Sequence, residues 1–214
     1  MERKDFEEHL VNNIIPFWNK MVDKENGGFY GYADADGNPG KDSVKGCILN
    51  SRILWFYSSA YSLLKKQELL EKAEHAFLFL QDSFFDSRYG GVYWSVQADG
   101  TPEDTTKHTY NQAFAIYALS AYYMAGGKKE ALDLAYSLYR TIEEKCRDAA
   151  GYFEAFDRAF VPVSNEKLSE NGVLAERTMN TLLHVMEAYT ELYRADGFFE
   201  VGDSIREILR IFKR

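Results

Sequence analysis

Apolar side chains recur at helical spacing along most of the 214-residue chain. The first predicted helix covers residues 4–22, where an apolar residue recurs every four positions: Phe6, Leu10, Ile14 and Trp18. The same period predicts six further helices: 45–65, 67–85, 108–126, 128–146, 173–195 and one that begins near residue 197. The pattern therefore predicts an all-α protein.

A glycine and aromatic motif interrupts the helical pattern three times. Its copies read Gly27-Gly28-Phe29-Tyr30, Gly90-Gly91-Val92-Tyr93-Trp94 and, in a weaker form, Gly151-Tyr152-Phe153. Each copy predicts a short β-hairpin or ordered loop, in which glycine permits the positive φ of a tight turn. The copies start about 60 residues apart, so the chain is built from a repeat of helix, hairpin and helix.

Every second predicted helix is rich in small residues, whereas the helices between them carry more Lys and Glu. The small-residue helices are 45–65, 108–126 and 173–195. Small side chains let helices crowd around an inner circle, and charged helices suit an outer ring. Spacing alone fits an α-solenoid or a closed toroid, and the small residues favour the α/α toroid. No Pro- or Gly-rich linker divides the sequence, so residues 1–214 are expected to form one domain.

Composition and charge restrict the class of ligand. Aromatic residues make up 15% of the chain, which suits thick helical cores and, in clefts, platforms for sugars. The formal net charge of −8 argues against a nucleic-acid partner. Cys47 and Cys146 form no close-spaced metal or redox pair, and no run of about 18 apolar residues predicts a membrane span. We expect a cytoplasmic protein with a small polar ligand and no membrane partner.

Arg52 and Tyr110 are candidate ligand-binding residues near the starts of two small-residue helices. Arg52 lies among apolar and small residues, where a guanidinium either pairs with a carboxylate or offers donors to sugar hydroxyls and a developing oxyanion. Tyr110 is either a core residue or a hydrogen-bond donor toward the ring centre. Both interpretations of each residue remain open at the level of sequence.

Asn180, His184 and Glu187 form a polar stripe on one face of the predicted helix 173–195. Because this helix is otherwise apolar, the stripe is expected to be buried and to bond either within itself or to a ligand. A structural His–Glu hydrogen bond and a catalytic histidine oriented by Glu187 are both compatible with the spacing.

Other chemistry is poorly supported. The remaining histidines are too dispersed for a metal site: His9, His75 and His108. No metal site is therefore expected. A glycoside hydrolase on the same toroid would need two facing carboxylates. The hairpin carboxylates are better explained as turn formers: Asp34, Asp36, Asp99 and Asp157.

Five segments together resemble, in order, the motifs of the N-acylglucosamine 2-epimerase family. They are Gly27–Gly31, the stretch from Lys45-Gly46 to Asn50-Ser51-Arg52-Ile53-Leu54-Trp55, Tyr89–Ser95, Ala113–Ser120, and Met179-Asn180-Thr181 with His184 and Glu187-Ala188-Tyr189. The Asn-x-Arg-Ile-Leu-Trp form is similar to the cellobiose 2-epimerase branch. One departure is Leu182, where relatives often have a second histidine.

The resemblance implies an (α/α)6 barrel and cofactor-free inversion at C2 of a reducing-end glucose, through a cis-enediolate, to give the mannose configuration. It implies catalytic roles for His184 and Arg52, with Arg52 at the oxyanion and His184 at the ring-oxygen or O1 end. It implies substrate binding by Tyr110, Asn180 and Arg52, and Glu187 supports His184.

The family's two main acid–base histidines belong to a C-terminal half, so this chain is expected to be the N-terminal portion of the barrel and inactive alone. Its expected partners are a disaccharide or hexose and either the missing half or a second copy. The alternative is a non-catalytic half-ring that binds sugar or pairs with itself.

Overall fold

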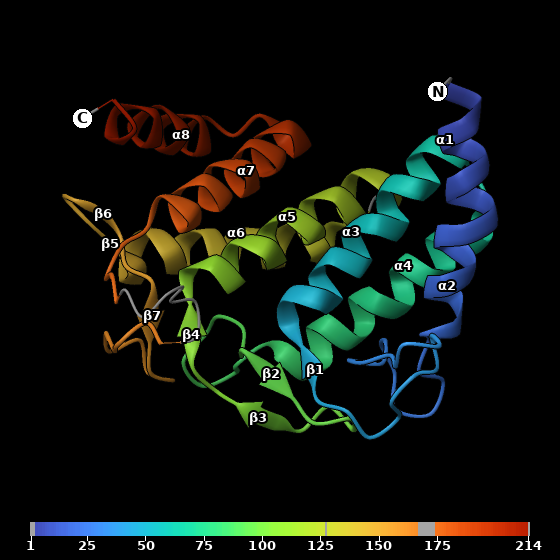
Figure 1. Cartoon of the computed structure of the whole chain (residues 1–214). Coiled ribbons are helices and arrows are strands. Elements are labelled where there is room, and N and C mark those ends of the chain that lie inside the picture. Colours follow the sequence, from blue (N-terminus) through green and yellow to red (C-terminus); the bar gives the residue numbers. More distant parts are fainter. Residues whose placement is uncertain (1–2, 127, 167–173, 214) are drawn as a thin grey trace.

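Seven helical segments dominate the computed structural model, which describes residues 3–126, 128–166 and 174–213 (Figure 1). The first is continuous through α1 (Arg3–His9), the π-helical turn η1 (Leu10–Ile14) and α2 (Ile15–Lys20). The others are α3 (Cys47–Leu64), α4 (Gln67–Phe79) with η2 (Leu80–Phe84), α5 (Thr109–Gly126), α6 (Lys129–Thr141) with η3 (Ile142–Cys146), α7 (Met179–Asp196) and α8 (Phe199–Ile211). The predicted helical content is confirmed.

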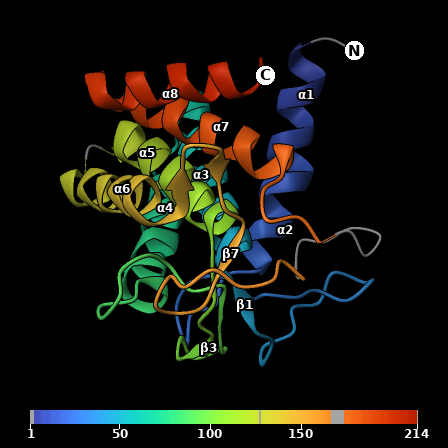
Figure 2. The ribbon, with the colours of Figure 1, turned by 90° about the vertical axis from the view of Figure 1, so that its left-hand side faces the viewer.

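The helices form an open arc of two layers. Helix α5 packs between α3 and α7, and these three line the inner side of the arc. Helices α4, α6 and α8 each pack on the inner helix that precedes them in the chain. Figures 1 and 2 show α8 over α7 at one end of the arc and α1 and α2 beside α3 at the other. This is the α/α toroid architecture predicted from the small-residue helices.

Short strands form the loops at the starts of the inner helices. Their bounds are β1 (Lys45–Gly46), β2 (Ser95–Val96), β3 (Pro102–Asp104), β4 (Lys107–His108), β5 (Arg147–Asp148), β6 (Gly151–Tyr152) and β7 (Ala155–Phe156). They pair antiparallel as β1-β2-β3, β4-β7 and β5-β6. In each glycine motif an antiparallel pair closes the turn: Val22 with Phe29, Phe85 with Val92, and Arg147 with Tyr152.

Glycine is required where the first loop passes the end of an outer helix. Gly28 has a φ of +65°, and a Cβ there would lie 2.5 Å from the ring of Phe79. Both the backbone conformation and the close approach exclude a larger residue. The predicted positive φ of the motif glycines is therefore confirmed at this position.

One hydrophobic core runs between the two layers of helices. Its largest fully buried side chains include Tyr57, Tyr122 and Tyr189. Buried hydroxyls need partners, and Tyr189 donates to Glu143 Oε1 at 2.8 Å while Tyr57 donates to Asn19 Oδ1 at 2.9 Å. Aromatic side chains from helices and loops therefore make up much of this core. Within the described ranges, no helix is both long and apolar enough to cross a bilayer.

The start of α7 differs from the prediction. The apolar period predicts a helix from residue 173, which lies outside the described residues, but α7 begins at Met179. Thr178 caps it, because its Oγ1 accepts a hydrogen bond from the Thr181 N–H at 3.1 Å. The residues just before are not helical, and the Glu176 carbonyl accepts from the Glu154 N–H at 2.8 Å.

Candidate functional site

Three inner helices bring candidate residues together around the ring of Phe114 on α5. The Arg52 guanidinium, from α3, lies 4.5 Å from the centre of that ring. The His184 imidazole, from α7, lies 4.9 Å from it, and Tyr110 packs beside Phe114 at the same distance. Tyr110 and His184 also meet edge to face at 4.8 Å. The cluster of Arg52, Tyr110, Phe114 and His184 is called the Phe114 cluster below.

Arg52 is exposed on the inner side of the arc. Among the described residues no carboxylate forms an ion pair with it, so the carboxylate-paired alternative is not observed in that part of the chain. A cation over an aromatic ring contributes about 0.5–1 kcal/mol at an exposed site, enough to orient the guanidinium. Its N–H donors remain available to a ligand or to a developing negative charge.

His184 is held by Glu187 one turn later on the same helix. The imidazole Nδ1 lies 2.7 Å from Glu187 Oε2. The His184 side chain is 20% exposed and that of Glu187 is 52% exposed. An N–H on Nδ1 that donates to Glu187 leaves Nε2 as the ring nitrogen that can accept a hydrogen bond or a proton.

The polar stripe of α7 faces an open surface, so its expected burial is wrong. Asn180 is exposed one turn before His184, and Glu187 is exposed one turn after it. The helix is apolar because its other faces pack on α5 and α8. The stripe therefore needs no internal partner, and its amide and carboxylate remain accessible to a ligand.

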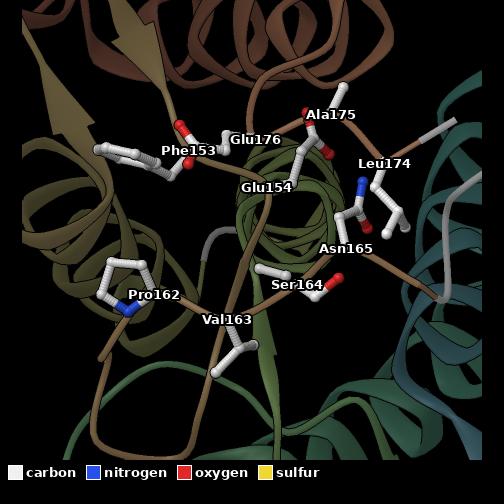
Figure 3. Close-up of a pocket in the computed structure, with 10 residues that line it drawn as sticks. Phe153, Glu154, Pro162, Val163, Ser164, Asn165, Leu174, Ala175 and Glu176 are labelled. Carbon is white, nitrogen blue, oxygen red and sulfur yellow. The ribbon is translucent and has the colours of Figure 1, made fainter.

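A mostly apolar groove of ≈ 400 Å³ continues from the Phe114 cluster toward α2 and is lined by Trp18, Leu49, Arg52, Ile53, Trp55, Phe56, Phe114 and Tyr117. Trp55 and Tyr117 stack in it, with ring centres 5.6 Å apart. Burial, together with the carboxylates of Glu191 and Glu187, raises the pKa of Tyr117, so its hydroxyl remains a donor. A second hollow of ≈ 340 Å³ lies among the loop residues 153–155, 162–165 and 174–176 (Figure 3).

Phe114 was not predicted as part of the site. Its signal was available, because it follows Tyr110 by one helical turn and therefore shares its face. Nothing in the sequence shows that one buried phenylalanine would contact side chains from three helices. Only the packing of α3 and α7 on either side of α5 reveals that role.

The hairpin carboxylates are held in turns. Asp34 accepts from the N–H groups of Asp36 and Asn38, and Asp99 accepts from Thr101. Asp157 similarly accepts from two N–H groups of its own loop. These bonds are those of turn formers, as predicted, rather than of a paired acid and nucleophile. Within the part of the chain that the structure describes, no three His, Cys, Asp or Glu side chains gather as metal ligands.

The other histidines lie away from the cluster. His75 packs against Phe29 and bonds the carbonyls of Asp23 and Gly28. His108 is buried and packs against Trp94 at the start of α5. Their positions fit the scaffold rather than the candidate site.

The α/α toroid thus presents a guanidinium, an imidazole–carboxylate pair and a tyrosine on its inner face. Residues 28–211 match the N-acylglucosamine 2-epimerase (GlcNAc 2-epimerase) family, and the chain belongs to that family. The family expectation from the sequence motifs is confirmed.

Curated relatives place the chain near the cellobiose branch. It is 60% identical over 186 residues to the cellobiose 2-epimerase of Eubacterium cellulosolvens, covering 87% of this chain and 46% of that protein. It is 55% identical over 202 residues to the cellobiose 2-epimerase of Ruminococcus albus, covering 94% of this chain and 52% of that protein. The chain thus spans about half the length of these relatives.

Solved structures agree on the fold. A sugar epimerase from a ruminal bacterium superposes with a TM-score of 0.94 at 54% identity, over 96% of this chain and 53% of that one. The cellobiose 2-epimerase of Bacillus thermoamylovorans superposes equally well at 45% identity, over 98% of this chain and 54% of that one. A family 76 glycoside hydrolase from Bacteroides thetaiotaomicron, at 18% identity and a TM-score of 0.74, shares the fold alone.

Proposed function

We propose that this chain supplies one wall of the active site of a sugar 2-epimerase that interconverts glucose and mannose configurations at C2 of a reducing-end sugar such as that of cellobiose. The single observation that carries the proposal is the Phe114 cluster, in which a guanidinium and an oriented imidazole meet on the inner face of an epimerase-family fold. The curated cellobiose 2-epimerases support the choice of sugar.

The chemistry assigns a role to each side chain. Removal of the C2 proton from the open-chain sugar gives a cis-enediolate, whose negative oxygen Arg52 stabilises. Groups of this kind contribute on the order of 10²–10³ in rate. His184, oriented by Glu187, exchanges a proton at the ring-oxygen or O1 end during ring opening. Tyr110 and Asn180 donate and accept hydrogen bonds that hold the open chain in place.

Inversion at C2 needs proton donors and acceptors on both faces of the enediolate. Within the described residues, His184 is the only imidazole of the Phe114 cluster, so this wall serves one end of the sugar. We therefore assign the C2 acid–base groups to the half of the ring that this chain does not contain. The chain's partner would be a polypeptide that contributes those remaining helices.

Exposed apolar side chains support this partner. One end of the arc exposes Phe6 and Phe17, and the other exposes Met179, Phe199 and Phe212. The inner groove between these ends is mostly apolar. Apolar side chains exposed at both ends fit a second set of helices that closes the ring.

The test follows hydrogen exchange at C2 of cellobiose in D₂O by NMR. The chain alone should give negligible exchange. Addition of a polypeptide that corresponds to the other half of the Eubacterium cellulosolvens relative should restore it. In that mixture Arg52→Lys should lower the rate about 10²-fold, whereas the matched variant Arg140→Lys, on the outer surface of α6, should leave it unchanged.

Each outcome decides a part of the proposal. Rapid exchange by the chain alone would contradict the need for a partner half. A stable complex of the two halves without exchange would leave a non-catalytic sugar-binding ring as the better explanation. Self-pairing instead of pairing with the other half would appear as a dimer in light scattering.

A further inference from the structure

A buried carboxylate from an earlier loop bonds the first turn of α7, which has no acidic residue of its own. Glu154 is 1% exposed and lies in the loop before α7. Its Oε1 accepts from the N–H of Thr178 at 2.7 Å, and its Oε2 accepts from Thr181 Oγ1 at 2.6 Å. Both oxygens are therefore committed to the first turn of α7.

These bonds complete the arrangement known as a capping box. In the usual form, the N-cap hydroxyl bonds the third helical N–H, and a carboxylate at that third position bonds the N-cap N–H. Thr178 makes the first bond to Thr181, but position 181 holds no carboxylate. Glu154 supplies it from 24 residues earlier in the chain. A carboxylate there also suits the positive end of the helix.

The backbone of the same residue holds the start of α5. The Glu154 carbonyl accepts from the N–H of Thr109, the first residue of α5, at 3.0 Å. Figure 3 shows Glu154 over the end of that helix, beside the segment of Ala175 and Glu176. One residue thus connects the first turns of α5 and α7. Those turns hold Tyr110 and Asn180, and His184 follows one turn later.

The preceding repeat uses the equivalent position in the same way. Trp94 follows the second loop's Gly91 by three residues, as Glu154 follows Gly151. The Trp94 carbonyl accepts from the N–H of Cys47, the first residue of α3, at 3.0 Å. Its ring packs on His108, the residue before α5, at 4.6 Å. In both repeats the residue at this position therefore contacts the starts of two successive inner helices.

We propose that Glu154 is a positioning residue that fixes the first turn of α7 against α5 and so sets where His184 and Asn180 stand relative to Tyr110 and Phe114. The inference rests on the proposed function, which assigns the sugar site to residues on α5 and α7. Glu154 touches none of the Phe114 cluster and acts only through the helix starts.

The test measures the folded chain directly by NMR and needs no sugar. Glu154→Leu removes both acceptors at similar volume. Loss of its bond to the carboxylate should speed hydrogen exchange of the Thr178 amide by about 10–100-fold, and the Thr181 amide should also exchange faster because its acceptor, Thr178 Oγ1, is less well held. The His184 ring signals, which lie under the ring currents of Tyr110 and Phe114, should move. Amides of α3 and α4 should keep their protection.

Two further variants keep the test decisive. Glu154→Gln retains one carbonyl acceptor and should return the His184 signals close to those of the parent chain. Thr181→Val, which removes only the hydroxyl donor, should shift them in the same direction as Glu154→Leu by a smaller amount. It replaces Glu154→Leu if that variant does not fold.

The matched control is Glu176→Gln, an exposed carboxylate in the segment before α7 whose side-chain partner among the described residues is Arg177. It should leave the His184 signals unchanged. A merely structural Glu154 would lower the urea midpoint of unfolding and leave the folded-state His184 signals where they are. That result, or an equal shift in the Glu176→Gln control, would overturn the inference, whether or not the chain binds sugar.

Discussion

The three glycine loops have the same turn geometry, but the turn carboxylate is buried in the first two loops and lies at the surface in the third. In the first two, a carboxylate accepts two backbone N–H groups of the turn and pairs with a lysine from the strand before the next inner helix. Lys45 bonds Asp23 at 2.7 Å, and Lys107 lies 3.2 Å from Asp86. All four side chains are fully buried. Each lysine also bonds a glycine carbonyl of its loop.

In the third loop the same pair lies at the surface. Asp148 accepts from two N–H groups of its turn, as its counterparts do, but its partner is Arg177. These side chains are 42% and 28% exposed, and the guanidinium stacks on Phe153 at 3.8 Å. A repeated sequence motif therefore keeps its turn geometry while its electrostatic contribution changes with burial.

The difference predicts unequal contributions to stability. Removing one partner of a buried ion pair leaves an uncompensated charge and costs about 3–5 kcal/mol. An exposed pair contributes about 0–1 kcal/mol, because water already solvates both groups. The ion pairs of the first two loops should therefore contribute more to the free energy of unfolding than that of the third loop, which leads into α7.

The largest effect is expected for Lys45→Met. Asp23 has no other cation among the described residues, and the Gly27 carbonyl also loses its donor. Urea unfolding should show a loss of about 3–5 kcal/mol. The double variant Asp23→Asn with Lys45→Met should recover part of it. A loss below about 1 kcal/mol would remove the distinction between the buried and exposed loops.

Lys107→Met should cost less, about 2 kcal/mol, because Asp86 keeps a second cation. Arg158 bonds both oxygens of Asp86, at 2.9 and 3.2 Å, from a position that is 42% exposed. Urea unfolding of Lys107→Met, Arg158→Met and the double variant measures how much each cation contributes to the free energy of unfolding. A double variant no worse than the sum of the single ones would show that they do not substitute for each other.

Acid should weaken the second loop. Burial raises the pKa of Asp86, but the Arg158 hydrogen bond, the Arg88 N–H and Lys107 outweigh burial and hold that pKa well below its usual range. The folded-state pKa is therefore below the unfolded value of about 4. Stabilisation is complete above about pH 4 and is lost as pH falls, by at most about 1.4 kcal/mol per pH unit.

The check compares the parent with Asp86→Asn by urea unfolding at pH 6 and at about pH 3. The stability gap between them should narrow at the lower pH, because the Asp86 carboxylate of the unfolded parent then binds a proton while that of the folded parent stays ionised. A gap that is constant or widens would contradict the direction of the shift.

The smallest effect is expected for Arg177→Met, at about 0–1 kcal/mol, because this pair is solvated. Thermal or urea unfolding measures it. A loss above about 2 kcal/mol would mean that the stacking on Phe153, rather than the ion pair, holds the third loop. Phe153→Leu would then reproduce the loss.

Helices and layers could be predicted from the sequence because their signal is local. Apolar period located the inner and outer helices within a few residues, and the His184–Glu187 contact follows from spacing on one helix. The start of α7 could not be predicted, since its cap depends on a hydroxyl at Thr178 and a distant Glu154. The apolar period continues into residues 174–178, which are not helical in the fold.

The buried lysines were missed for a related reason. Lys45 and Lys107 look like surface residues, because lysine is seldom buried without a partner. A signal existed: they follow Asp23 and Asp86 by similar intervals, 22 and 21 residues. Only the repeat, compared copy by copy, connects each lysine to its carboxylate. The open polar face of α7 likewise depends on which helices surround it.

The π-helical turns have a consequence for how such repeats tolerate change in length. Both η2 and η3 end an outer helix two residues before the turn carboxylate of the next loop, Asp86 or Asp148. A π-turn holds one residue more than an α-turn, and one residue corresponds to about 100° of rotation. A deletion there would redirect the whole loop away from the inner helices. We therefore expect an added residue to be tolerated in the loops beyond the strands, and a residue removed from η2 or η3 to displace the loop that follows.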